Sequence, residues 1–160
     1  MAVLLTASCS DAVTSDVGDS SSPTTSNVEA VAQSAIDGPV MRYPTLPNSD
    51  DGMAAEVRGT LQIEGDCLYV FVDEAGERYP ILWPAGTSWN EQNQSVTPSA
   101  GSPMPIGSVV SGGGGYLHVG DVKRLAGNDA AAAASRCLDN QFGEIAVVNN
   151  QADAIVLSSG

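Results

Sequence analysis

The sequence predicts a mainly β protein: a small barrel or sandwich of five to six strands with one short helix, preceded by a disordered N-terminal tether. Apolar and polar side chains alternate over several short segments that are separated by Gly, Asp and Pro, which is typical of half-buried strands joined by tight turns. Before residue 54, large apolar side chains are too few to build a core. We therefore expect the folded domain to lie within residues 54–160.

The first nine residues are apolar and end at a cysteine. Val3-Leu4-Leu5 is an apolar run, and the small residues Ala7 and Ser8 stand directly before Cys9. This order resembles the end of a bacterial lipoprotein signal peptide, in which the cysteine is lipidated and becomes the mature N-terminus. The resemblance implies that residues 1–9 are a leader with the lipidation site at Cys9, and that the chain is anchored in the cell envelope on the outer face of the cytoplasmic membrane. The other interpretation is an apolar N-terminus whose cysteine is accidental.

Residues 10–53 are expected to form a disordered acidic tether. Ser, Thr, Asp and Gly dominate residues 10–27, and such a segment cannot bury enough apolar surface to offset its conformational entropy. Residues 28–36 could form two or three helical turns, but this stretch is too short to be stable alone. Gly38-Pro39 and the prolines that follow are expected to interrupt regular structure until about Met53.

A three-stranded meander is expected at the start of the folded region. Residues 56–64 alternate apolar and polar side chains, and Gly65-Asp66 is typical of a hairpin turn. Residues 67–72 are a continuous β-branched and aromatic run, which predicts the central, most buried strand. Residues 78–83 follow as the third strand, and Pro80 is expected to confine it to an edge or a bulge because proline cannot donate to the ladder.

The next segment predicts a long loop and a pair of strands. Residues 84–105 are rich in Ser, Gly, Asn and Pro, and loops of that length inside a compact domain are usually functional or disordered. Four consecutive glycines at 112–115 predict a flexible turn or bulge between strands at residues 106–111 and 116–119.

The last segment predicts one helix and two further strands. Asn128 is typical of a helix N-cap, and the alanine-rich residues 130–135 have high helix propensity. Residues 144–149 and 153–157 are strand candidates on either side of a polar turn.

Several short motifs are distributed over this region: Gly65-Asp66-Cys67-Leu68-Tyr69, Trp83-Pro84-Ala85-Gly86, the four glycines and Arg136-Cys137. Together they resemble a recurring bacterial envelope β domain of actinobacterial-type lipoproteins of unassigned function. The resemblance covers most of residues 54–149 and implies a small OB-like barrel, but no reaction. An OB fold usually has its helix between the third and fourth strands, whereas the helix predicted here falls between the fourth and fifth.

Cys67 and Cys137 remain in the folded region once Cys9 is assigned to lipid. In an exported domain an even pair predicts a disulfide, and the alternative is two buried reduced thiols in a cytosolic protein. The bridge would join the end of the predicted helix to the start of the strand at residues 67–72. No CxxC motif is present, so thiol–disulfide catalysis has no support.

No residue pattern predicts a catalytic, metal or cofactor site. His118 is the single histidine, and no GxSxG elbow accompanies it. One histidine and two paired cysteines cannot form a zinc or copper site. The acid pairs Asp73/Glu74 and Glu64/Asp66 fall in predicted turns, where we expect their carboxylates to be solvated rather than catalytic.

The charge and the aromatic residues indicate which partners to expect. The net charge is −13, which argues against binding of nucleic acids and against docking of a basic patch on anionic lipid.

Trp83 and Trp89 flank the start of the long loop. With Tyr116 they are candidate contacts for an envelope protein or glycan. Alternatively, Trp83 fills the core and Trp89 packs the loop onto it. We therefore expect a membrane-anchored domain that binds without catalysis. A hydrolase of envelope polymers with a carboxylate pair and a purely structural spacer are the alternatives.

Overall fold

The computed structural model of the 160-residue chain describes residues 34–44, 53–72, 74, 76–140, 142–149 and 155–157. The chain divides into two units, Met1–Val31 and Ala32–Gly160, and every described residue belongs to the second. The predicted leader with Cys9, and residues 10–33 and 45–52 of the predicted tether, lie outside the described residues. The described elements are β1 (Ile36–Asp37), β2 (Val40–Tyr43), β3 (Ala55–Glu64), β4 (Cys67–Val72), β5 (Glu77–Pro84), β6 (Ser88–Asn90), β7 (Ser95–Thr97), β8 (Met104–Pro105), β9 (Val109–His118), α1 (Val119–Cys137), β10 (Glu144–Val148) and β11 (Ile155–Leu157).

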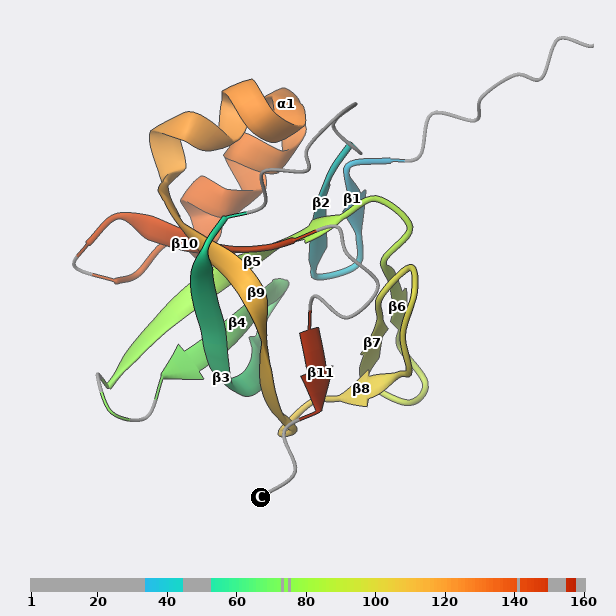
Figure 1. The fold of residues 1–160 in the computed structure, drawn as a ribbon. Helices are drawn as coiled ribbons and strands as arrows, with labels where there is room; N and C mark the ends of the chain where they lie inside the picture. The colour runs from blue at the N-terminus through green and yellow to red at the C-terminus, as the bar shows by residue number, and fades with distance from the viewer. Residues whose placement is uncertain are drawn as a thin grey trace, which may run out of the picture. The chain divides into compact units, whose positions relative to one another are not determined.

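Strands β3, β4, β5, β10 and β9 close into a barrel (Figure 1). β3 pairs with β4, β4 with β5, β5 with β10, β10 with β9, and β9 again with β3. Of these five barrel pairs, only β5–β10 is parallel. In chain order the strands run first, second, third, fifth and fourth around the barrel, which is the Greek-key order of an OB fold. The prediction of a small, mainly β, OB-like barrel with one helix is confirmed.

The connections differ from those of a usual OB fold. Helix α1 joins β9 to β10, the fourth and fifth barrel strands, as the sequence predicts. The connection between the third and fourth barrel strands holds instead a small antiparallel sheet of β6, β7 and β8. The prediction of a loop without strands at residues 84–105 is therefore wrong, because strands of two or three residues are too short to show an alternating pattern.

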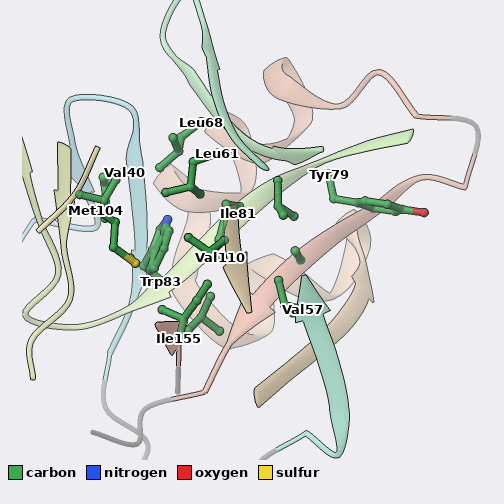
Figure 2. Close-up of a cluster of buried hydrophobic side chains, with 14 residues drawn as sticks. Val40, Val57, Leu61, Leu68, Tyr79, Ile81, Trp83, Met104, Val110 and Ile155 are labelled. Carbon is green, nitrogen blue, oxygen red and sulfur yellow. The ribbon is translucent and has the colours of Figure 1, made fainter. Parts of the chain in front are cut away.

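The barrel has one core inside and a second core between its wall and the helix. Along β5, Ile81 and Trp83 face the interior while Leu82 faces outward, and along β10 Ala146 faces inward while Val147 faces outward. The interior cluster, drawn in Figure 2, has Met104 beside Trp83 and the ring of Tyr79 at its edge. Helix α1 covers the outer face of β2, β5 and β10 with its buried residues Val122, Ala126, Ala130, Ala133, Ala134 and Cys137.

Helix α1 is longer than the helix predicted at residues 130–135. It runs from Val119 to Cys137, and Gly127 interrupts it with φ 85° and ψ −178°. Only glycine reaches such a backbone conformation at low cost. The predicted N-cap, Asn128, lies one residue after the interruption, so the predicted helix corresponds to the second part of α1.

The fold begins earlier than the sequence predicts. β2 pairs in parallel with β5, with Met41 opposite Leu82, and Val40 and Met41 are 0% and 2% exposed. β1 includes Ile36, which was expected to end a helical stretch. The predicted domain boundary at residue 54 is therefore wrong for residues 34–44. The prolines on either side of β2 lie outside the strand and so do not interrupt it.

Three further predictions about strands are wrong. The four glycines form no turn, because they lie inside the continuous strand β9. β4 is not the most buried strand, because three of its six residues are only partly buried, whereas every residue of β5 from Tyr79 to Pro84 is buried. Pro80 is not at a sheet edge. The parallel ladder with β10 begins at Ile81, one residue beyond the proline, so its missing N–H falls before that ladder.

Candidate binding site

A cavity of about 380 Å³ lies against β3 and β9, beside the turn that follows β4. We call it the Tyr116 cavity. Its wall combines one aromatic ring, two valines, a glycine and three charged side chains. The lining residues are Glu56, Arg58, Gly59, Val72, Glu74, Val109 and Tyr116.

The alternation of β3 places two charges on one side of this cavity. Val57 and Leu61 are fully buried in the barrel interior, so Glu56 and Arg58 point outward on the same face of the strand. Gly59 lies within β3, beside the end of the neighbouring strand β4. A Cβ atom at Gly59 would lie 2.2 Å from the carbonyl oxygen of Phe71, so only glycine allows the strands to approach this closely.

Tyr116 supplies the aromatic part of the wall. It is partly buried against the interior core and contacts Tyr79 edge to face, with ring centroids 4.8 Å apart and an interplanar angle of 61°. Burial raises the pKa of Tyr116 above its ordinary value, and the nearby acidic groups of Tyr79, Glu56 and Glu144 raise it further. The phenol is therefore protonated at neutral pH, and its hydroxyl can both donate and accept a hydrogen bond.

The charged side chains on the rim are not neutralised by one another. Glu56 accepts a hydrogen bond of 2.6 Å from the Ser111 hydroxyl, and Glu74 is exposed in the turn after β4. Among the described residues, Arg58 forms no ion pair within 4 Å; Asp73 lies outside them. Other arginines do have acidic partners: Arg42 with Asp37, Arg78 with Glu64 and Asp139, and Arg124 with Asp121.

Trp83 does not form a contact surface, contrary to prediction. Its side chain is 0% exposed in the interior core, and its Nε1 has no hydrogen-bond partner among the described residues. Trp89 is partly buried and packs on the turn between β1 and β2, where a Cβ atom at Gly38 would lie 2.7 Å from its ring. Its backbone N–H donates to Asp37 at 3.3 Å. Both tryptophans thus follow the alternative of core and loop packing, and of the three predicted contacts only Tyr116 lines the cavity.

A second cavity, of about 300 Å³, lies between β11 and the segment before β8. Val156 and Leu157 are 50% and 47% exposed there. None of its lining residues is charged, so it offers neither an acid–base group nor an ionic anchor. They are Ala100, Gly101, Ser102, Met104, Ile155, Val156 and Leu157.

Cys67 and Cys137 form a disulfide, as the sequence predicts. Their Cα atoms are 5.5 Å apart, and the bond joins the first residue of β4 to the last residue of α1. Close by, Arg78 pairs with both Glu64 and Asp139 and stacks over the ring of Tyr69, with Cζ 4.7 Å from the ring centroid. Glu64 is therefore part of a structural ion pair.

Of the other residues considered in the sequence, the structure describes His118 and the acid pairs except Asp73. His118 is exposed at the end of β9. No group of three His, Cys, Asp or Glu residues within the described part of the chain is placed to hold a metal ion. In that same part, no helix is long and apolar enough to span a bilayer.

Comparison of the chain with protein-family models, with curated proteins and with solved structures finds no match in any of the three. The residues of the cavity itself are therefore the basis for inferring its ligand. Sequence reasoning found Tyr116 and the alternation that turns Glu56 and Arg58 outward, but it treated Glu74 only as a solvated turn acid. No signal in the sequence shows that this turn lies beside β3.

Proposed function

We propose that this chain is an exported domain, lipid-anchored at Cys9 on the outer face of the cytoplasmic membrane, which binds a ligand or a partner group at the Tyr116 cavity without catalysing a reaction. The anchor is supported by the apolar run and the small residues that precede Cys9. Export is further supported by the disulfide Cys67–Cys137, because disulfides persist mainly in oxidising compartments.

The observation that carries the binding function is the make-up of the Tyr116 cavity. Ligand sites are concave, partly apolar and supplied with a few polar groups, with volumes of about 300–1,000 Å³. This cavity has about 380 Å³, the ring of Tyr116, two valines, and the charged groups of Glu56, Arg58 and Glu74. A general acid is usually buried to raise its pKa, whereas Glu56 and Glu74 are both exposed, which favours binding over catalysis.

Replacing Tyr116 with Ala tests this function, because it removes the aromatic wall of the cavity. The probe is a mixture of soluble cell-wall fragments released by a muramidase, added to the ¹⁵N-labelled protein and followed by NMR at the Gly59 amide. We expect the fragments to shift this signal in the wild type and to lose at least ten-fold in affinity in Tyr116→Ala. Trp89→Ala is the matched control and should bind normally, since Trp89 lies outside the cavity. Equal shifts in Tyr116→Ala and wild type would refute binding at this site.

A hydrolase of envelope polymers is the second candidate, because Glu56 and Glu74 line the same cavity. If it is correct, the wild type releases new reducing ends from the cell-wall fragments, and Glu56→Gln and Glu74→Gln each abolish that release. We expect no release by the wild type.

The anchor has its own test, the intact mass of the protein expressed in a bacterium that processes lipoproteins. We expect the loss of residues 1–8, the added mass of acyl chains on Cys9, and a deficit of two hydrogens for Cys67–Cys137. A mass that shows all three cysteines free and unmodified would rule out both the anchor and the compartment.

A further inference from the structure

The Tyr116 cavity presents charges of both signs to the same space. Glu56 and Arg58 come from the outward face of β3, and Glu74 comes from the turn after β4. All three side chains belong to exposed residues, while the apolar part of the wall is the ring of Tyr116 with Val72 and Val109.

The register of β3 with β9 keeps the charges on β3 available. Glu56 lies opposite Gly113, which has no side chain, and Arg58 lies opposite the neutral residue Ser111. Neither therefore meets an opposite charge across the strands. The Ser111 hydroxyl donates to Glu56 and holds its carboxylate in place without neutralising it.

This arrangement discriminates between ligands by charge. A simple anion is repelled by the two carboxylates and by the net charge of −13. A simple cation is attracted by the carboxylates, but it brings a second positive charge towards Arg58. A molecule with a positive and a negative group close together satisfies both sides of the cavity and has no net charge for the protein field to repel.

We infer that the ligand of the Tyr116 cavity is zwitterionic: an amino acid or the free ends of a short peptide, with its ammonium group at Glu56 and Glu74 and its carboxylate at Arg58. This inference rests on the proposed function, because it assigns a ligand class to the same cavity. The ring of Tyr116 and the two valines contact the apolar part of the ligand.

Four forms of one dipeptide separate the charges. The probes are dialanine, its N-acetyl form, its C-terminal amide and the form blocked at both ends, each titrated into the full chain with its disulfide formed. At about pH 6.5 the free amino group is protonated, since its ordinary pKa is about 7.7–8.0. Affinities are read from the Gly59 amide signal. We expect each blocked end to weaken binding about two- to five-fold, the range of exposed ion pairs.

Two sets of variants assign each end of the ligand. In Arg58→Gln, dialanine and its amide should bind equally, because the partner of the carboxylate is gone. In the double variant Glu56→Gln/Glu74→Gln, dialanine and its N-acetyl form should bind equally. Lys123→Gln and the double variant Glu91→Gln/Asp129→Asn make the same changes in net charge with exposed residues outside the cavity, and they should keep the wild-type order of affinities.

The outcomes separate this inference from the proposed function. Equal binding of the four forms, or loss of the order in the control variants, overturns the zwitterionic ligand. If the four dipeptide forms bind equally but cell-wall fragments still bind more weakly to Tyr116→Ala than to the wild type, the zwitterionic ligand is refuted and the proposed binding function is retained. If Tyr116→Ala binds fragments and dipeptides as the wild type does, both the ligand class and the binding function are refuted. Thermal unfolding of each variant confirms that a lost preference does not come from a lost fold.

Discussion

Two neighbouring side chains on β2 bind groups on different parts of the fold. The Arg42 guanidinium donates to the carbonyl oxygen of Ser34 at 2.6 and 3.0 Å and to that of Thr87 at 2.9 Å. The Tyr43 hydroxyl donates to the carbonyl oxygen of Val148 at 2.7 Å. The first set holds the start of the domain and the β5–β6 connection, and the second joins β2 to the end of β10. These contacts stabilise the position of β2, although the strand has only four residues.

Replacing Tyr43 with Phe is expected to destabilise the protein by about 1 kcal/mol at pH 8, because one buried hydrogen bond is lost. Burial raises the pKa of Tyr43 to about 12, above the value of about 10 for an exposed tyrosine. Since the folded pKa is the higher one, the stabilisation by Tyr43 is complete below about pH 10 and is lost as the pH rises towards 12. The difference in unfolding free energy between wild type and variant, from urea denaturation, should shrink between pH 9 and pH 11. A constant difference would contradict this.

The aromatic residues show how far single residues can be read from sequence. Composition marks Trp83, Trp89 and Tyr116 as anchors of a core or of a site, but it cannot separate these roles, because both use large apolar side chains. Trp83 is interior because it lies two residues after Ile81 on the same face of β5. That assignment needs the pairing of β5 with strands on both sides, which is not a local property.

Strand β9 is the element that most depends on glycine. It pairs with β3 on one edge and with β10 and β11 on the other. A Cβ atom at Gly114 would lie 2.2 Å from the carbonyl oxygen of Val147 and 2.7 Å from a methyl group of Val57. The absence of a side chain at this position allows the strands to pack closely, where the sequence alone indicated a turn.

Gly114→Ala is expected to destabilise the barrel by about 3 kcal/mol, at the upper end of the cost of overpacking, because the obstructing atom is backbone and cannot rotate away. The matched control is Gly120→Ala in the first turn of α1, where a Cβ atom would meet nothing within 4 Å. That variant should be as stable as the wild type or slightly more so. The measurement is urea denaturation followed by tryptophan fluorescence, and equal stability of the two variants would show that the strands can separate without cost.

Short elements were the hardest to predict. β2 has four residues and is stabilised by a parallel partner about 40 positions later, so no local pattern indicates it. The positions of β3 and β4 were predicted correctly because the alternation along β3, the β-branched and aromatic run of β4 and the turn between them are local. The helix was found from its alanines, but its first part, which has fewer alanines, was missed.

At the scale of the whole molecule, the disulfide joins two parts of the domain that are far apart in the sequence. Cys67 and Cys137 are separated by 70 positions, and closing a loop of that length is worth about 4 kcal/mol. The double variant Cys67→Ala/Cys137→Ala should lose about this amount from a total of about 5–15 kcal/mol. Dithiothreitol should produce the same loss in the wild type and no loss in the variant. A wild type that is insensitive to reduction while its disulfide opens would contradict the expectation.

The fold class, the position of the helix between the fourth and fifth barrel strands and the disulfide could all be predicted, because they depend on local periodicity, composition and an even count of thiols. The cavity could not. Its lining joins β3, the turn after β4 and β9, and this juxtaposition exists only once the barrel is closed. Glu74 illustrates the limit, since in the sequence it is one acidic turn residue among several.

Because of the parallel pairs around β5, closure of the barrel depends on segments that are synthesised at different times. Leu82 lies between Met41 on one side and Val147 on the other, so β5 needs one neighbour made about 40 residues earlier and one made about 65 residues later. Contacts so distant along the chain slow folding. The barrel cannot close while residues 144–148 are still in the ribosome or a translocation channel, and a chain cut short before them would expose strand edges on which other chains can assemble.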